Sequence, residues 1–600
     1  MHLTTLALLP LLSLSDSVRL VAGYVAQARL EGPTCTRTTV AILGGGMAGV
    51  TAAQTLANAS ITDFLILEYR DTLGGRVTHT EFGQDPNGES YIIELGANWI
   101  QGLGSETTEN PVWALVHHPL PHPPSLFQTI NRPDRTVSAQ AKKHNLTNTP
   151  SNYDSILTYN ETGYADYTST LEQYALAREK ASLHAGRILN SNLQDMTARS
   201  GLALAGWRPR RDDMAAQAVE WWNWGMALHS EPDGAQLKLT RISPERDEGL
   251  TFKNIDWEGA SAPETSSFVF GVAAENLTFN QFGAQNNLVL DARGYSTIIH
   301  GEAKTFLLGP DDPRLWLNTQ VTEIEHSAHG VVIRNADGSC VSAAYAITTF
   351  SVGVLQNNVV RFEPELPEWK RTAIEKFTMG TYTKIFLQFP YTFWPEETEF
   401  FLYASPTTRG FYPVFQSLSK TGILPGSNIL FVTVVETHSY RVERQSDAQT
   451  QAEILSVLRE MFPDREIPDP IAFTYPRWST EPWAYGSYSN WPAGTTLEMH
   501  QNLRANVGRL WFAGEATSAQ YFGFLHGALF EGREVGTSVA ALLLEECARG
   551  SGHGGIAGSE RRKDGLCGGR THYGVLHGTT PLAAYSGVNG WGVNSTSIQA

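Results

Sequence analysis

Glycines at residues 44–49 have a spacing suited to holding a ligand that contains phosphate. The segment reads G-G-G-M-A-G, follows an apolar, β-branched run and opens a helical stretch. In this pattern Gly44 allows a tight turn, Gly46 lets the backbone approach a pyrophosphate, and Gly49 permits close packing of the helix. Glu68 ends the next apolar run, where its carboxylate can accept hydrogen bonds from ribose hydroxyls. The pattern therefore predicts a dinucleotide-binding β-α-β unit.

Two further turns of small residues follow within the next thirty or so positions. Gly75 and Arg76 lie in the segment L-G-G-R-V, and Asn98 and Trp99 lie in E-L-G-A-N-W. Such turns allow the backbone to approach a ligand closely, and the guanidinium supplies a cation. We expect both turns to lie within reach of one extended ligand.

The apolar run at 382–389 predicts a strand that carries a lysine. Alternation places Tyr382 and Lys384 on one face, together with Phe386 and Gln388, while the other face is apolar enough for a core. Taken alone, a lysine in a strand is more commonly a solvated charge or one that protects a sheet edge.

Together these segments resemble the flavin-containing amine oxidases, most closely the polyamine oxidases of plant type. The matching segments occur in the same order as in that family, from about residue 38 to about residue 547, and the resemblance is weakest over 117–250. The segments that carry it read A-I-L-G-G-G-M-A-G, I-L-E-Y-R-D-T-L-G-G-R-V, I-E-L-G-A-N-W-I-Q-G, M-G-T-Y-T-K-I-F-L-Q-F-P, G-S-Y-S-N-W-P and L-W-F-A-G-E-A-T-S-A-Q-Y-F-G-F-L-H-G-A.

The resemblance implies that the cofactor is FAD. The residues that it assigns to FAD binding are Gly44, Gly46, Gly49, Glu68, Gly75, Arg76, Asn98, Trp99, Val321, Glu515, Gly523, Phe524 and Leu525. Val321 corresponds to an adenine contact and Glu515 to an acid on the ribitol. A helix that begins near Leu525 would direct its positive end at the negative charge of a reduced flavin.

The resemblance also implies the residues that act on the substrate. Lys384 matches the family lysine that holds a water at flavin N5, and with Tyr382 it is assigned a catalytic role. Buried there, Lys384 would have a lowered pKa and relay protons during reoxidation. Tyr488 and Phe524 match an aromatic pair that encloses the substrate. Several tryptophans are either additional walls or plain core; they are Trp221, Trp222, Trp224, Trp478 and Trp483.

Gln101 is the departure from the family pattern that bears on the substrate. Plant-type polyamine oxidases tend to have glutamate at the matching position, and a second acid of their substrate tunnel aligns with Ala227 here. Gln101 is still assigned to substrate binding. If both acids are absent, the remote ammonium of a polyamine loses two anchors, so polyamine preference weakens while the oxidation chemistry survives.

The implied reaction is hydride loss from an amine to flavin N5, hydrolysis of the imine, and reduction of O2 to hydrogen peroxide. The small-molecule partners are thus a polyamine-like amine and O2. Because hydride loss needs the nitrogen lone pair, activity should rise with pH as the amine or Lys384 loses its proton. Two alternatives remain: a flavin oxidase of the same fold that acts on a specialised metabolite, and a non-catalytic flavin-binding protein.

The element pattern predicts an α/β plus α+β protein. A discontinuous Rossmann-like FAD-binding domain is expected over 38–116, 251–367 and 496–547. A substrate domain with a mixed sheet flanked by helices is expected over 117–250 and 368–495. The first part of the substrate domain is expected to be helical with loops, and residues 548–600 are expected to form a flexible tail rich in glycine.

Composition excludes several functional classes. With 44 Lys and Arg against 61 Asp and Glu, the net charge of -17 leaves no basic surface for nucleic acid. No apolar run is long enough to span a bilayer. The four cysteines lie far apart and have no spacing typical of a metal site, so no metal is expected.

The N-terminus predicts a secreted or lumenal protein. Residues 3–14 are apolar and are followed by A-Q-A at 26–28, a pattern typical of a signal peptide over 1–28. Glycosylation sequons agree with this prediction; they begin at Asn58, Asn145, Asn160, Asn276 and Asn594.

Overall fold

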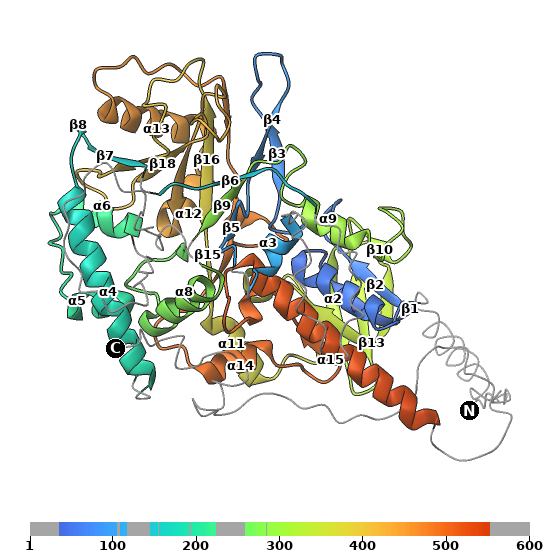
Figure 1. Ribbon diagram of the computed structural model, residues 1–600. Helices are drawn as coiled ribbons and strands as arrows, with labels where there is room; N and C mark the ends of the chain where they lie inside the picture. Colours follow the sequence, from blue (N-terminus) through green and yellow to red (C-terminus); the bar gives the residue numbers. More distant parts are fainter. Residues whose placement is uncertain are drawn as a thin grey trace, which may run out of the picture.

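The structure is a computed structural model that describes residues 35–104, 108–116, 144–153, 155–190, 194–223, 259–283 and 285–551. Two large sheets organise the chain (Figure 1). The predicted signal peptide and nearly all of the predicted tail lie outside the described residues. Within the described residues, no helix is both long and apolar enough to cross a membrane.

The first sheet has a parallel centre and an antiparallel extension. Its strand order is β10-β2-β1-β13-β12-β11-β14, and β22 also pairs with β13. The bounds are β1 Thr36–Leu43, β2 Phe64–Leu67, β10 Leu315–Trp316, β11 Val321–His326, β12 Val331–Asn335, β13 Cys340–Thr348, β14 Arg361–Glu363 and β22 Leu510–Phe512. The parallel strands are continuous apolar runs because both faces of this part of the sheet are covered.

Two helices pack together beside the first sheet, and the glycine pattern explains their closeness (Figure 1). They are α2, Met47–Asn58, and α15, Leu525–Ser551. A Cβ at Gly532 would overlap the carbonyl of Ala48, and one at Gly536 would lie 2.9 Å from the carbonyl oxygen of Ala52. α15 continues to Ser551, so the first residues of the predicted tail over 548–600 are helical.

A disulfide joins the N-terminal ends of two neighbouring parallel strands in this sheet, β1 and β13. Cys35 and Cys340 are joined, with their Cα atoms 4.6 Å apart. They directly precede the paired residues Thr36 and Val341 of β1 and β13. The bond therefore fixes the strand that leads into the glycine turn, a pairing that cysteine spacing alone did not predict.

The second sheet is mixed, with the order β20-β16-β19-β18-β17-β7-β8. All neighbours are antiparallel except β17 and β7. The bounds are β7 Ile156–Asn160, β8 Gly163–Tyr164, β16 Tyr382–Gln388, β17 Phe400–Tyr403, β18 Val414–Ser417, β19 Ile429–Val435 and β20 Ala472–Thr474. The two sheets and their helices confirm the predicted fold class, whereas the exact domain boundaries stay a prediction.

The helices grouped with the second sheet contact its strands or one another. They are α4 Thr168–Asn190, α5 Ala198–Leu204, α6 Met214–Asn223, α12 Glu436–Arg444 and α13 Asp447–Met461. The expectation of helices and loops up to residue 250 was wrong for 148–164, which forms three short strands. β7 is a strand because it pairs with β17, more than 200 residues away, and a local pattern carries no such information.

Small sheets and helices connect the two large sheets. The two-stranded pairs are β3 His79–Phe82 with β4 Tyr91–Glu94, and β15 Thr378–Gly380 with β21 Tyr488–Asn490. The three-stranded sheet contains β5 Trp99–Gln101, β9 Asn286–Val289 and β6 Asn148–Pro150. The remaining helices are α3 Pro111–Val116, α8 Phe268–Phe282, α9 Thr297–Ala303, α10 Val352–Gln356, α11 Glu368–Lys376, α14 Leu497–Arg504, η1 Trp478–Thr480 and η2 Glu515–Thr517.

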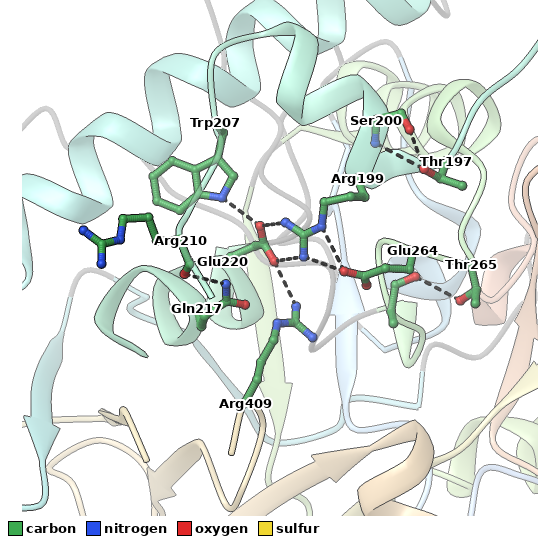
Figure 2. Close-up of polar contacts among 11 residues, drawn as sticks. Thr197, Arg199, Ser200, Trp207, Arg210, Gln217, Glu220, Glu264, Thr265 and Arg409 are labelled. Atoms are coloured by element: carbon green, nitrogen blue, oxygen red, sulfur yellow. Dashed lines mark hydrogen bonds and ion pairs between the residues drawn. The ribbon is translucent and has the colours of Figure 1, made fainter. Parts of the chain in front are cut away.

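A buried glutamate ties the α5–α6 region to the second sheet, as Figure 2 shows. Glu220 on α6 is fully buried and accepts hydrogen bonds from Arg199, from Trp207 Nε1 at 2.7 Å, and from Arg409 Nη2 at 3.3 Å. Arg199 also donates to Glu264. These charge-assisted bonds compensate the desolvation of the carboxylate and hold four segments together.

Candidate active site

One cavity of about 320 Å³ lies between the two sheets and collects most of the predicted site residues. We name its two ends by their lining. The glycine end contains Gly44, Gly46 and Glu68, and the aromatic end contains Tyr382, Tyr488 and Phe524. The other predicted residues that line the cavity are Gly75, Arg76, Asn98, Trp99, Gln101, Val321, Glu515, Gly523 and Leu525. Gly49 and Lys384 do not line it.

The glycine turn has the geometry that its sequence predicts. Gly44 has φ +114°, in a region that favours glycine, and a Cβ at Gly49 would overlap the carbonyl oxygen of Gly44. Gly46 is the N-cap of α2 and has no side-chain cap, and a Cβ on it would meet no atom of the described residues closer than 3.9 Å. Gly49 therefore serves packing, while Gly46 leaves the helix N-terminus open to an anion.

Glu68 lies at the end of β2 with 5% of its surface exposed. It accepts hydrogen bonds from the backbone of Gly45 at 2.6 Å and of Arg70 at 2.9 Å. Desolvation raises the pKa of Glu68, and these backbone bonds oppose the rise. Because each carboxylate oxygen accepts one of these bonds, acceptor capacity remains for a ligand hydroxyl.

Glu515 joins three segments of the cavity wall. Its Oε1 accepts from Arg76 Nη1 at 2.9 Å and from the backbone of Ser489 at 3.1 Å. Its Oε2 accepts from Ser489 Oγ at 2.6 Å and from the backbone of Gly523 at 2.8 Å. Four donors fill the usual acceptor sites of a carboxylate. Glu515 thus positions Arg76 and the turn before α15, a role that sequence reasoning did not assign to it.

Asn98 supplies a buried polar atom to the cavity wall. The residue is 6% exposed, and its Oδ1 has no hydrogen-bond partner among the described residues. Since buried polar atoms are rarely left unpaired, this oxygen indicates a donor on a bound molecule. Together with the open helix N-terminus at Gly46 and the carboxylate of Glu68, the wall fits a dinucleotide such as FAD.

Lys384 lies directly behind the cavity wall, 1% exposed. Its Nζ donates to the carbonyl oxygen of Gly96 at 2.8 Å and lies 5.6 Å from the ring centre of Trp99. Both Gly96 and Trp99 line the cavity. The predicted alternation also holds, because Tyr382 and Lys384 share a face and Ile385 belongs to the core on the other face.

A buried carboxylate that sequence reasoning missed accompanies Lys384. Glu94 ends β4, is 5% exposed and accepts from the backbone of Tyr295 at 2.6 Å through Oε1. Its Oε2 has no hydrogen-bond partner among the described residues. Burial lowers the pKa of Lys384 to about 7 and raises the pKa of Glu94 to about 7, while the attraction between the two opposes both shifts. The pair can therefore hold or release a proton near neutral pH.

The aromatic end combines side chains from distant segments. The rings of Tyr382 and Tyr488 lie 6.2 Å apart at 43°, because β15 pairs Gly380 with Tyr488. Phe524 is stacked on His526, with ring centres 5.0 Å apart, and burial lowers the pKa of His526 to about 3. A neutral histidine and aromatic rings give this end an apolar character suited to an alkyl chain.

The predicted tryptophan walls divide into two groups. Trp478 and Trp483 line the cavity, whereas Trp221 and Trp222 are buried in the core and do not. Trp224 and Ala227 lie outside the described residues. Gln101 lines the cavity and is held in β5 by pairing with Asn286.

Glu275 on α8 is a cavity residue that the sequence reasoning missed. It is 4% exposed, lines the cavity, and its Oε2 accepts from Arg178 Nη2 at 2.7 Å. The available signal was a single acid in the apolar helical run F-V-F-G-V-A-A-E. Such an acid is costly to bury without a purpose or a partner.

Comparisons with known proteins agree with this geometry. A family model described as flavin containing amine oxidoreductase matches residues 47–539. Polyamine oxidase 1 from Zea mays is 36% identical over 520 residues, which cover 85% of this chain and 91% of the maize protein. Polyamine oxidase 7 from Oryza sativa subsp. japonica is 36% identical over 541 residues, covering 88% and 98% of the two chains. A solved structure of putrescine oxidase bound to putrescine shares the fold, with TM-score 0.58, 15% identity, and coverage of 85% of this chain and 100% of that chain.

Proposed function

Because the chain belongs to the flavin containing amine oxidoreductase family and is an FAD-dependent amine oxidase, we propose that it oxidises polyamine-like aliphatic amines. One observation carries the proposal: a single cavity connects a dinucleotide-type glycine end to an aromatic end beside a buried lysine. The chemistry that FAD supplies when bound is acceptance of a hydride from the carbon next to the amine nitrogen and, with O2, formation of hydrogen peroxide.

The protein's own residues hold the reactants for this reaction. Gly46 and the N-terminus of α2 would hold the pyrophosphate, and Glu68 would accept from the ribose hydroxyls. The N-terminus of α15, with Leu525 at the cavity wall, would stabilise negative charge on the flavin ring. Arg76 is held in place by Glu515 and balances its charge.

At the aromatic end, Tyr488 and Phe524 enclose the alkyl chain and exclude water from the amine. The apolar surroundings favour the neutral amine, whose lone pair is needed for hydride loss. Lys384, whose Nζ donates to Gly96 directly behind the wall, would hold or move a proton during reoxidation by O2, with Glu94 as its partner.

A panel of amines tests this proposal. Purified protein is mixed without oxygen with spermine, spermidine, acetylated polyamines, and simple alkyl and aryl monoamines, and the flavin absorbance is followed. The expected result is rapid bleaching by polyamines, with hydrogen peroxide released when air is admitted. Bleaching only by other amines would replace the polyamine assignment.

The second candidate function is oxidation of a specialised amine that is not a polyamine. Gln101 favours it, because this residue lines the cavity at the position where the plant-type enzymes tend to have an acid. The same panel separates the two candidates: the second predicts monoamines with bulky groups as the best substrates.

We also propose that the protein is secreted or lumenal and carries a cleaved signal peptide over 1–28. The disulfide between Cys35 and Cys340 supports this, because such bonds persist in oxidising compartments. Asn58 and Asn145 of the sequons are exposed, as glycosylation requires. Expression in a eukaryotic host should give a glycosidase-sensitive protein in the medium that lacks the first 28 residues. Retention in the cytosol with an intact N-terminus would reject the proposal.

A further inference from the structure

A buried carboxylate on α12 joins the strand that carries Lys384 to the tryptophan wall of the cavity. Glu443 is 4% exposed and does not line the cavity. Its Oε1 accepts a hydrogen bond from Thr383 Oγ1 at 2.6 Å. Its Oε2 accepts from the backbone of Ser479 at 2.8 Å and from the hydroxyl of the same residue. The carboxylate therefore bridges two segments that lie far apart in the sequence.

Each of the two bridged residues is the chain neighbour of an active-site residue. Thr383 directly precedes Lys384 in β16, and strand alternation places the two side chains on opposite faces. Ser479 directly follows Trp478 in η1, and Trp478 lines the cavity. Glu443 thus contacts neither active-site side chain but bonds the residue next to each.

The two active-site residues meet at Gly96, which closes a ring of contacts. Lys384 Nζ donates to the carbonyl oxygen of Gly96 at 2.8 Å. A Cβ added to Gly96 would lie 3.5 Å from Trp478 Cζ2, so the indole ring packs over this glycine. The ring of contacts runs from Glu443 through Thr383, Lys384, Gly96, Trp478 and Ser479 back to Glu443. Each part of such a ring opposes displacement of the others.

The burial of Glu443 makes the bridge difficult to break at one end only. Burial raises the pKa of Glu443, while the bonds from Ser479 and Thr383 oppose the rise. Each carboxylate oxygen accepts at least one of these bonds, so the orientation of the carboxylate is fixed. Without the carboxylate, buried donors on both segments would lose their acceptor, which is costly.

We propose that Glu443 is a positioning residue for Lys384: its bonds to β16 and η1 hold the lysine Nζ against the carbonyl of Gly96, directly behind the cavity wall. This inference rests on the proposed function and adds a residue that touches neither the amine nor the cavity. A group that moves protons must lie within hydrogen-bond reach of its partner. Because the ring converges on Lys384, its loss should slow reoxidation by O2 more than anaerobic reduction by the amine.

The kinetic test uses Glu443→Gln, which keeps the shape of the side chain but turns an NH2 group toward one of the two donor groups. The rate at which O2 restores flavin absorbance should fall about 10-fold, within the range for small displacements near a reacting group. Anaerobic bleaching by spermine should change by less than about 3-fold. Combined with Lys384→Met, the same substitution should add no further loss, because no lysine remains to be positioned.

A second readout needs neither flavin nor amine. Crystal structures of the apoproteins give the distance between Lys384 Nζ and the carbonyl oxygen of Gly96, which is 2.8 Å here. In Glu443→Gln this distance should exceed about 3.5 Å, beyond hydrogen-bond range. Thr383→Val removes only one hydroxyl of the ring and should reproduce the slower reoxidation, whereas Thr383→Ser keeps the hydroxyl and should retain the wild-type rate.

Glu399→Gln is the matched control. Glu399 is fully buried and accepts from the backbone of Asn152 at 3.1 Å and from Gln416 Nε2 at 3.2 Å, but it does not line the cavity. The variant should leave both rates unchanged. An equal loss in Glu399→Gln and Glu443→Gln would mean general destabilisation and would overturn the positioning role.

The remaining outcomes distinguish this inference from the proposed function. Failure of every amine to bleach the wild-type flavin overturns both together, and normal reoxidation in Lys384→Met overturns the role of the lysine and of Glu443. Slow reoxidation in Lys384→Met with a normal rate in Glu443→Gln overturns only the inference about Glu443. An unchanged distance in the apoprotein, or a further loss in the double variant, does the same.

Discussion

At the glycine end of the cavity the wall comes from short consecutive segments, 44–48, 67–69 and 74–77, while at the aromatic end it comes from side chains far apart in the chain. Tyr382 and Tyr488 belong to β16 and β21, and Phe524 directly precedes α15. The glycine end acts largely through backbone geometry, and the aromatic end through side chains. Changes at the first should therefore affect cofactor retention, and changes at the second should affect amine selection.

Two glycines with open surroundings give the largest expected contrast. A Cβ on Gly46 or on Gly271 meets no close atom of the described residues, so Ala fits the described fold at both positions. In Gly46→Ala the methyl group occupies the space of the pyrophosphate, and FAD affinity should fall about 100-fold. Gly271→Ala should keep its FAD and change only amine affinity. Titration of the two apoproteins with FAD measures their FAD affinities, and circular dichroism is the folding control. Equal FAD loss in both variants would contradict the division between the two ends.

Replacement of Lys384 should slow reoxidation more than reduction. Lys384→Met removes the group that hydrogen-bonds the carbonyl of Gly96, and loss of proton transfer typically costs about 100-fold or more. We expect that loss in the rate at which O2 restores flavin absorbance, with a much smaller change in anaerobic bleaching. Lys370→Met is the control, because Lys370 is equally buried but bonds Ala505 and the ring of Phe512, away from the cavity. A similar loss in both variants would indicate destabilisation.

The pH profile tests the pair of Lys384 and Glu94. Burial lowers the pKa of Lys384 to about 7, so its neutral form increases between pH 6 and 8 and activity should rise over that range. The Glu94 carboxylate favours the protonated lysine. Glu94→Gln should therefore shift the acid limb to lower pH and raise the relative rate at pH 6 by up to about 10-fold. A glutamine oxygen can still accept from Tyr295, so the fold is preserved. A flat wild-type profile from pH 6 to 9 is the result that rejects this role.

The same contrast explains what the sequence could predict. The glycine turn, Glu68 and the strand with Lys384 follow from local spacing, since a β-α-β unit and an alternating strand are local structures. The roles of Glu94 and Glu275, and the four hydrogen bonds that Glu515 accepts, could not be predicted in this way. They depend on tertiary contacts between segments that no local pattern connects. The prediction for β7 was wrong for the same reason, because its pairing partner β17 is distant in the sequence. The lone acid in the apolar run of α8 was a local sign of Glu275, but it did not indicate the arginine that Glu275 contacts.

The smallest expected effect comes from adding a charge at Gln101. This residue lines the cavity and is half-buried. A carboxylate there would attract a substrate ammonium, and solvent would partly screen the attraction. Gln101→Glu should lower the apparent dissociation constant for spermidine by roughly 1.5- to 5-fold, the range for a solvent-screened ion pair, and should leave the constant for dibutylamine, which lacks the terminal ammonium groups, unchanged. Gln101→Met controls for the loss of the amide. Tighter binding of both amines would mean that residue 101 affects the shape of the cavity and not its charge.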